Sequence, residues 1–161
     1  MLILLEGLVM AFWLLLICVV GIANGAVGLV IFYEQDVQDR VVELGLTTKE
    51  TIRKTMKISS ALLFVPVFTV VPAMVYGING AHGFWEGFWQ MTAILYIMNL
   101  FDRLFIDWYW VKHTKAWVIP GTEDLQPYIP RKTIIRKWVG TFVGFPVLAA
   151  ILAGIASFFI H

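Results

Sequence analysis

The stretch Leu100–Asp124, LFDRLFIDWYWVKHTKAWVIPGTED, places ionisable side chains among strongly apolar ones. Arg103 and Asp107 are one helical turn apart and can pair, because residues four positions apart are neighbours on a helix. An Arg side chain can hold a carboxylate through two parallel N–H donors. Asp102 and His113 lie beside this pair in the sequence. These residue types predict a polar site that binds an ion, a proton or a small anionic group.

A second chemistry is open to the same stretch. Pro120-Gly121 favours a tight turn that would return two further carboxylates towards the helix end. Together with Asp102, Asp107 and His113, those carboxylates could form one oxygen-rich metal site or supply a general acid and base. Its spacing matches no zinc or di-iron motif, and no Glu-x-x-His pair occurs. The sequence therefore assigns no catalytic residue, metal or cofactor, and the loop candidates are Glu123 and Asp124.

The polar residues of this stretch share one side of the expected helix. At about 100° per residue, Asn99, Asp102, Arg103 and Asp107 fall within less than half of the circumference. The opposite side, which includes Leu104, is apolar. One interpretation is a structural ion pair whose hydrogen bonds Asn99 and Asp102 complete. A second interpretation is that Asp102 and Arg103 line a pocket or path for an ion, a proton or an anionic headgroup. A third is that the charged side chains simply snorkel to the membrane surface.

The elements that carry this site are expected to be membrane helices. The chain has 161 residues, of which 60% are hydrophobic and 14% charged, and its mean hydropathy is +0.81. Soluble domains carry about 25% charged residues. Long apolar runs of about 18 residues or more indicate membrane spans. The formal net charge of +1 gives no reason to expect a nucleic-acid partner, and the single Cys18 excludes a disulfide within the chain.

We therefore expect an all-α fold: an integral membrane four-helix bundle in one domain, residues 1–161. The second helix should begin after a capping box at Thr47 and Glu50 and extend into the cytoplasm. Pro66 and Pro72 should kink it, because each removes an internal hydrogen bond. The expected spans are at about 2–33, 58–78, 84–111 and 138–160, and the long polar loops are 34–57 and 112–137.

The basic residues predict the orientation of these spans. Of the 12 Lys and Arg residues, all except Arg103 lie in the two long polar loops. The positive-inside rule therefore places both loops in the cytoplasm and both termini outside. Basic residues near the anionic leaflet attract lipid headgroups. The candidates for that contact are Lys54, Lys57, Arg131, Lys132, Arg136 and Lys137.

The opposite face carries its own polar side chains. Glu6, His82, Glu86 and His161 would all lie outside by this orientation. They could bind a metal, but ordinary polar residues at headgroup level are the expected interpretation.

Small residues four positions apart recur in the apolar runs and allow close helix packing. These pairs of small residues are Gly21 with Gly25, Gly140 with Gly144, and Ala150 with Gly154.

The expected partners of the chain are membrane lipids, together with a second copy of the chain or a membrane partner subunit.

These observations favour a small oligomeric channel, transporter or accessory subunit with a polar site at the cytoplasmic end of the third span. The alternative is an interfacial enzyme that acts on a lipid or another amphiphile, with Asp, His or Glu of the same region as acid, base or metal ligand. A purely structural membrane partner is the third hypothesis.

Overall fold

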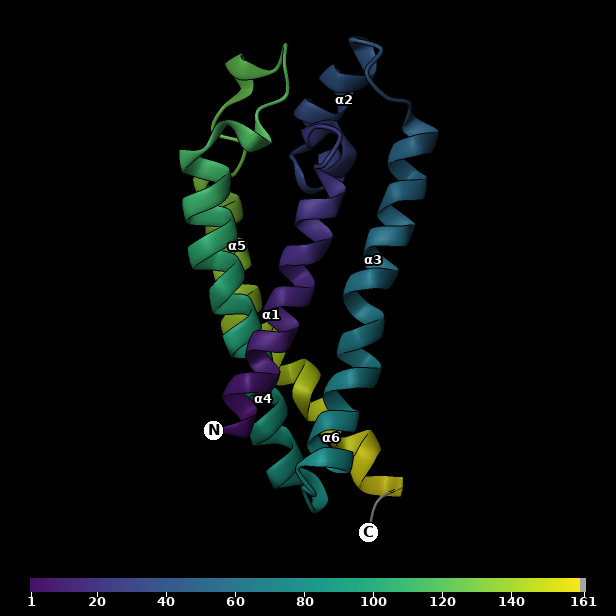
Figure 1. Cartoon of the computed structure of the whole chain (residues 1–161), viewed down its shortest axis with the longest axis vertical. Helices are drawn as coiled ribbons and strands as arrows, with labels where there is room; N and C mark the ends of the chain where they lie inside the picture. The colour runs from purple at the N-terminus through teal and green to yellow at the C-terminus, as the bar shows by residue number, and fades with distance from the viewer. Residues whose placement is uncertain (160–161) are drawn as a thin grey trace.

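The computed structural model describes residues 1–159, which form six α-helices joined by short 3-10 and π-helical segments. This part of the chain contains no β-strand, so the expected all-α class is confirmed. The long helices lie side by side, and short elements cover the end away from the N-terminus (Figure 1). The α-helices are α1 Leu2–Gly21, α2 Gln35–Glu43, α3 Lys49–Pro72, α4 Gly83–Phe101, α5 Arg131–Val139 and α6 Phe145–Phe159. The 3-10 segments are η1 Ala26–Phe32, η4 Lys115–Trp117 and η5 Glu123–Leu125, and the π-helical segments are η2 Ala73–Ile78, η3 Asp102–Val111 and η6 Gly140–Gly144.

Three helices of the described chain are long and apolar enough to cross a membrane: Leu2–Gly21, Lys49–Ile78 and Arg131–Phe159. The expectation of transmembrane helices is confirmed at this level, by length and composition. The helix formed by α4 and η3, Gly83–Val111, is not among them. Its sequence alternates apolar residues with polar ones such as Gln90, which lower its average hydropathy.

The first predicted span, 2–33, extends beyond the first helix of the structure. Helix α1 ends there, and the chain turns at Gly25, whose φ of 106° is accessible to glycine but rarely to other residues. The apolar run continues into η1, where Leu29 and Val30 are buried. These residues are apolar because they fill a protein core beyond the end of α1. The last predicted span ends at residue 160, which lies outside the described residues.

Helix α3 begins one residue later than the predicted capping box. Thr48 is the N-cap, and its Oγ1 accepts a hydrogen bond of 3.2 Å from the backbone N–H of Thr51. The helix continues through Pro66 and Pro72 without interruption, and its hydrogen bonding becomes π-helical directly after Pro72. A proline removes one donor, and a local change of helix type lets the neighbouring carbonyls find other partners.

Helix α4 lies at the centre of the packing, with α1 and α6 against it. At its crossing with α1, a Cβ added to Gly7 would lie 2.6 Å from the Cβ of Ile97, so this contact requires glycine. Among the predicted pairs of small residues, Gly21 is also at a close contact, since a Cβ there would lie 2.5 Å from Leu29, but the glycines of the last helix behave differently. A Cβ at Gly140, Gly144 or Gly154 would meet nothing within 4 Å, so these glycines do not mark close contacts between the described helices.

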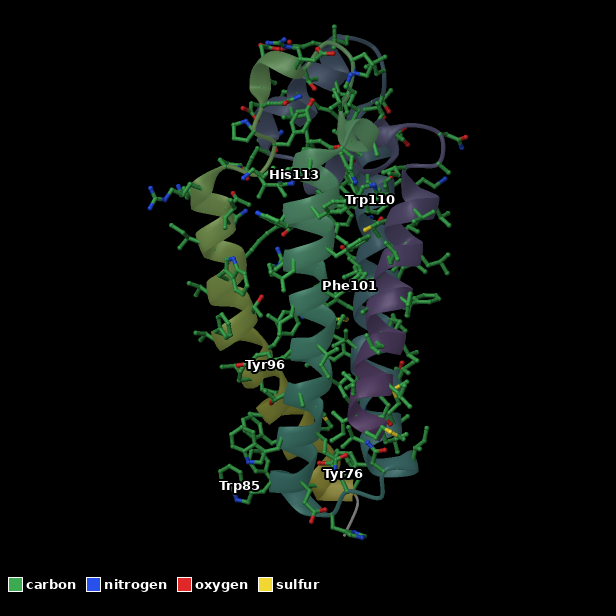
Figure 2. All side chains as sticks on the ribbon, turned by 60° about the vertical axis from the view of Figure 1, so that its left-hand side comes forward. Tyr76, Trp85, Tyr96, Phe101, Trp110 and His113 are labelled. Atoms are coloured by element: carbon green, nitrogen blue, oxygen red, sulfur yellow. The ribbon has the colours of Figure 1, made fainter. Side chains whose placement is uncertain are left out.

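Figure 2 shows the course of α4 and η3 from Trp85 at one end, through Tyr96 and Phe101, to Trp110 and His113 at the other.

The buried side chains form two clusters. One surrounds Met91 and Leu95 of α4 and includes residues of α1, α3, η2 and α6. The other joins the end of α1, η1 and α2 to the segment after His113. This second cluster holds the covering elements over the end of η3.

Candidate functional site

Four charged side chains meet between η3 and α5. Arg103 forms ion pairs with both Asp102 and Asp107. Lys137 of α5 adds a third link, because its Nζ lies 2.8 Å from Oδ1 and 2.9 Å from Oδ2 of Asp107. The side chains of Arg103 and Asp107 are only 10% and 15% exposed. We call these four residues the ion cluster.

The ion cluster balances its formal charges but not its hydrogen bonds. Two carboxylates face two cations, so no net charge is left in this half-buried region. The Nε–H of Arg103, however, is buried and has no hydrogen-bond partner among the described residues. A buried donor without a partner costs about 1–3 kcal/mol, and more in a charged group. Arg103 therefore retains the capacity to bind one further acceptor.

A cavity of about 430 Å³ lies on one side of the ion cluster. This volume is in the range of small-molecule sites. Its wall combines cations with apolar and aromatic side chains, and Asp107 is the one carboxylate among the lining residues. The cations are Arg103, Lys112, Arg131 and Lys137, and the apolar residues include Leu104, Trp108, Val111, Val118, Ile134 and Trp138.

A second cavity, of about 260 Å³, lies on the other side, towards Cys18 of α1. Both cavities are lined by Arg103, Asp107 and Lys137, so the ion cluster forms the wall between them. Asp102 lines the second cavity but not the larger one. Three residues of the cluster therefore face both cavities, while the charges of the cluster balance one another.

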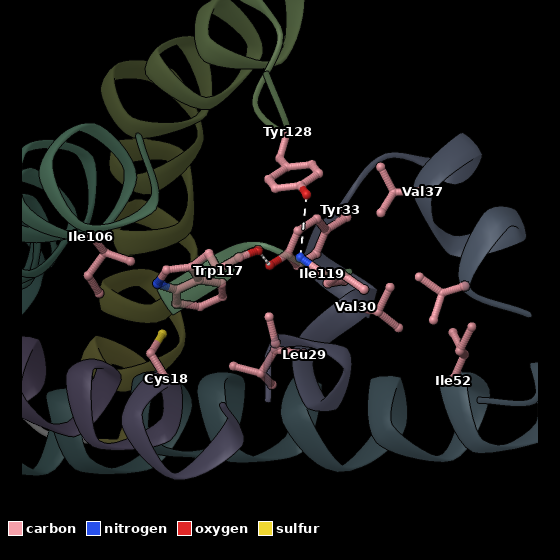
Figure 3. Close-up of a cluster of buried hydrophobic side chains, with 12 residues drawn as sticks. Cys18, Leu29, Val30, Tyr33, Val37, Ile52, Ile106, Trp117, Ile119 and Tyr128 are labelled. Atoms are coloured by element: carbon pink, nitrogen blue, oxygen red, sulfur yellow. Dashed lines mark hydrogen bonds between the residues drawn. The ribbon is translucent and has the colours of Figure 1, made fainter. Parts of the chain in front are cut away.

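The segment 114–130 forms the roof of the larger cavity and is tied to η1 and α2. The hydroxyl of Tyr33 donates to the carbonyl of Trp117 at 2.6 Å, and the hydroxyl of Tyr128 accepts from the backbone N–H of Ile119 at 3.4 Å (Figure 3). Tyr128 also bonds the hydroxyl of Thr122, at 2.9 Å. The rings of Tyr33 and Tyr128 meet edge to face, 5.0 Å apart. Burial, with Tyr128 nearby, raises the pKa of Tyr33, so its hydroxyl stays protonated and able to donate even at alkaline pH. The roof is therefore held by buried hydrogen bonds and aromatic packing.

Polar contacts at the surface complete this attachment. Thr133 of α5 donates a hydrogen bond to Glu34, the residue that precedes α2. Arg40 of α2 pairs with Asp124 at 3.3 Å. The predicted loop candidate Asp124 thus serves to attach the roof, and Glu123 accepts a hydrogen bond from the backbone N–H of Gly121. The structure brings neither carboxylate into the ion cluster.

Two predicted site residues lie apart from the ion cluster. Asn99 is buried and donates to the carbonyl of Leu95 in its own helix, at 2.9 Å. His113 is exposed, and its Nδ1 lies 2.7 Å from the carbonyl oxygen of Trp108. One reason is that η3 is π-helical, so its residues advance by less than the 100° assumed for an α-helix. Within residues 1–159, no group of three or more His, Cys, Asp or Glu could hold a metal ion.

The predicted headgroup residues divide into three kinds. Lys137 is drawn into the ion cluster, which its position in a basic run did not indicate. Arg131 is exposed and lines the larger cavity. The remaining four are exposed and line neither cavity: Lys54, Lys57, Lys132 and Arg136. Sequence reasoning missed Lys112 and Tyr128, since only the folded roof brings them to the cavity.

The arrangement of these side chains is better suited to binding an anion than to acid–base catalysis. Asp107, the carboxylate that lines the larger cavity, is already held by two cations. Lys112 and Arg131 add two positive charges to the wall beyond the balanced ion cluster, and with the aromatic side chains they would attract an anion that also carries an apolar part. Comparison of the chain with models of protein families, with curated proteins and with solved structures found no match.

Proposed function

We propose that the chain is an integral membrane four-helix bundle in which Gly83–Val111 is the fourth span. Exposed Trp85 and Trp89 lie at one end of this helix, and exposed Trp108 and Tyr109 lie near the other. Such pairs of aromatic belts are typical of membrane helices at the two interfaces. Between these belts, Asn99 is buried and hydrogen-bonded, and Arg103 pairs with the carboxylates of the ion cluster, so these polar groups are satisfied within the protein.

In this proposal the roof and α2 lie in the cytoplasm, and the N-terminus and the end of α6 lie outside. The distribution of Lys and Arg supports this orientation. The N-terminus and the last turn of α6 also lie away from the roof (Figure 1).

Single cysteines test the orientation. In intact cells, a membrane-impermeant maleimide should label His82→Cys, in the short outer loop, and should leave Glu50→Cys unlabelled until the cells are permeabilised. Both positions are exposed. The unchanged chain is the control, because its Cys18 is buried. The reverse labelling pattern would contradict the proposed orientation.

At the cytoplasmic end, the larger cavity is proposed to bind an anionic amphiphile through a phosphate-type headgroup. The observation that carries this proposal is the cationic wall of the cavity, which includes Arg103, whose buried Nε–H has no hydrogen-bond partner among residues 1–159. Lys112 and Arg131 line the same wall, and neither forms an ion pair with a described residue. Charge-assisted hydrogen bonds to these groups would hold an anion.

The apolar part of the wall favours an amphiphile over a free anion. Leu104, Trp108 and Ile134 line the cavity and are also exposed on the outer surface. In the proposed orientation they connect the cavity to the lipid phase, so that an acyl chain could follow them. A headgroup site of this kind suits a transporter or an accessory subunit of a membrane complex.

A lipid titration of the purified protein in detergent tests the site. Dioleoylphosphatidic acid should raise the unfolding temperature more than dioleoylphosphatidylcholine or inorganic phosphate. Arg131→Gln should weaken the apparent affinity for phosphatidic acid by about tenfold or more, because one charge-assisted hydrogen bond contributes about 1.5–3 kcal/mol. The matched control is the neighbouring Lys132→Gln, which removes the same charge from a residue outside the cavity wall.

Each alternative outcome has a distinct meaning. An equal response to phosphatidylcholine would contradict an anion site, and an equal response to inorganic phosphate would contradict an amphiphile site. Equal losses in Arg131→Gln and Lys132→Gln would assign the effect to surface charge in general.

A further inference from the structure

A second polar group lies at the end of the bundle opposite the roof. Glu6 of α1, Asn79 after η2 and Gln90 of α4 meet there. The Nδ2 of Asn79 donates two hydrogen bonds, both of 2.9 Å, to Oε2 of Glu6 and Oε1 of Gln90. Three elements that are distant in the sequence thus bring side-chain oxygens to one point.

Two oxygens of this group are left without donors. Glu6 is only 5% exposed, and its Oε1 is buried with no hydrogen-bond partner among the described residues. The Oδ1 of Asn79 is in the same situation. Both atoms are acceptors, and buried acceptors of this kind call for an explanation such as a bound ion.

The elements that meet at Glu6 carry no Lys or Arg side chain. The sequence has no Lys or Arg in residues 1–39 or 58–102, which include α1, η2 and α4. Glu6 takes part in none of the ion pairs of residues 1–159. The neighbouring cluster, which includes Met10, Val75 and Met91, is apolar. A carboxylate in such surroundings is costly unless another charge compensates it.

We infer that Glu6, Asn79 and Gln90 bind a small alkali cation of the Na⁺ class at the outer end of the bundle. Oxygen atoms are the ligands that hard cations prefer, and the carboxylate supplies one negative charge, which one monovalent ion balances. The buried Oε1 of Glu6 and Oδ1 of Asn79 are the principal ligands, with Oε1 of Gln90 beside them. The site is separate from the ion cluster.

The outer residues expected from the sequence contribute differently. Glu86 accepts a hydrogen bond of 2.8 Å from the backbone N–H of His82, and both side chains are exposed. This contact closes the first turn of α4. His161 lies outside the described residues. Glu86 is therefore a carboxylate at the same end of the bundle with an ordinary structural role, which makes it a suitable control.

The test compares unfolding temperatures of the purified protein in NaCl and in choline chloride at equal ionic strength and pH. At a Na⁺ concentration about tenfold above its Kd, the unfolding temperature should rise by roughly 3–6 °C. Glu6→Gln should fold, because its amide can both donate to and accept from Asn79, and it should lose the response to Na⁺. Glu86→Gln should keep the response. Binding of ²²Na⁺ should follow the same pattern.

Three results would overturn the inference. The first is an equal unfolding temperature of the unchanged protein in the two salts. The second is an undiminished Na⁺ response in Glu6→Gln. The third is stabilisation that follows pH and not Na⁺, which would assign the compensating charge to a proton on Glu6.

Discussion

Replacing Arg103 with Ala is expected to lower the stability of the folded protein by about 3 kcal/mol or more. The substitution leaves Asp102 without its cation and leaves Asp107 with Lys137 alone. An uncompensated charge that is mostly buried costs far more than the loss of an exposed pair. The folded yield in detergent, measured by size-exclusion chromatography, should fall sharply.

Arg136→Ala is the matched control for this prediction. Arg136 is an exposed residue of α5 beside Lys137, and it forms no ion pair with a described residue. Its substitution should change stability by less than about 1 kcal/mol. Equal yields of the two variants would mean that Arg103 is not sheltered by protein.

Gly28→Ala is expected to destabilise the protein by about 3 kcal/mol, at the upper end of the usual cost of overpacking. A Cβ at this position would lie 2.1 Å from the backbone carbonyl oxygen of Gly21, so the strain cannot be relieved by moving a side chain. The turn after α1 would have to open, and η1 would leave the buried cluster under the roof. Thermal unfolding, monitored by tryptophan fluorescence, measures the effect.

Gly144→Ala provides the comparison, since a Cβ there would meet nothing within 4 Å. It lies inside a helical segment, where Ala is favoured over Gly by about 0.5–1 kcal/mol. Its unfolding temperature should stay unchanged or rise slightly. A similar loss in both variants would show that the Gly21–Gly28 contact is not the cause.

The all-helical class and the three most apolar helices could be predicted because long apolar runs have few alternatives to membrane helices. The pairing of Arg103 with Asp107 could also be predicted, because it depends only on spacing within one helix. The N-cap at Thr48 was missed by one residue, since Thr47 and Thr48 offer the same chemistry.

Contacts between distant segments could not be predicted in this way. Lys137 lies in a basic run, and only the packing of α5 beside η3 distinguishes it from Arg136. The run 22–33 is apolar enough to continue a span, and the turn at Gly25 redirects it into the core beneath the roof. Nothing in the sequence near Glu6 indicates Asn79 and Gln90 as its partners, because their meeting depends on how three helices end.

The most direct test of an anion-binding site between η3 and α5 is native mass spectrometry of the protein released from membranes. The unchanged chain should retain an acidic phospholipid, and a double variant, Lys112→Gln with Arg131→Gln, should lose it while remaining folded. Retention of no lipid, or the same lipid on both proteins, would contradict the account.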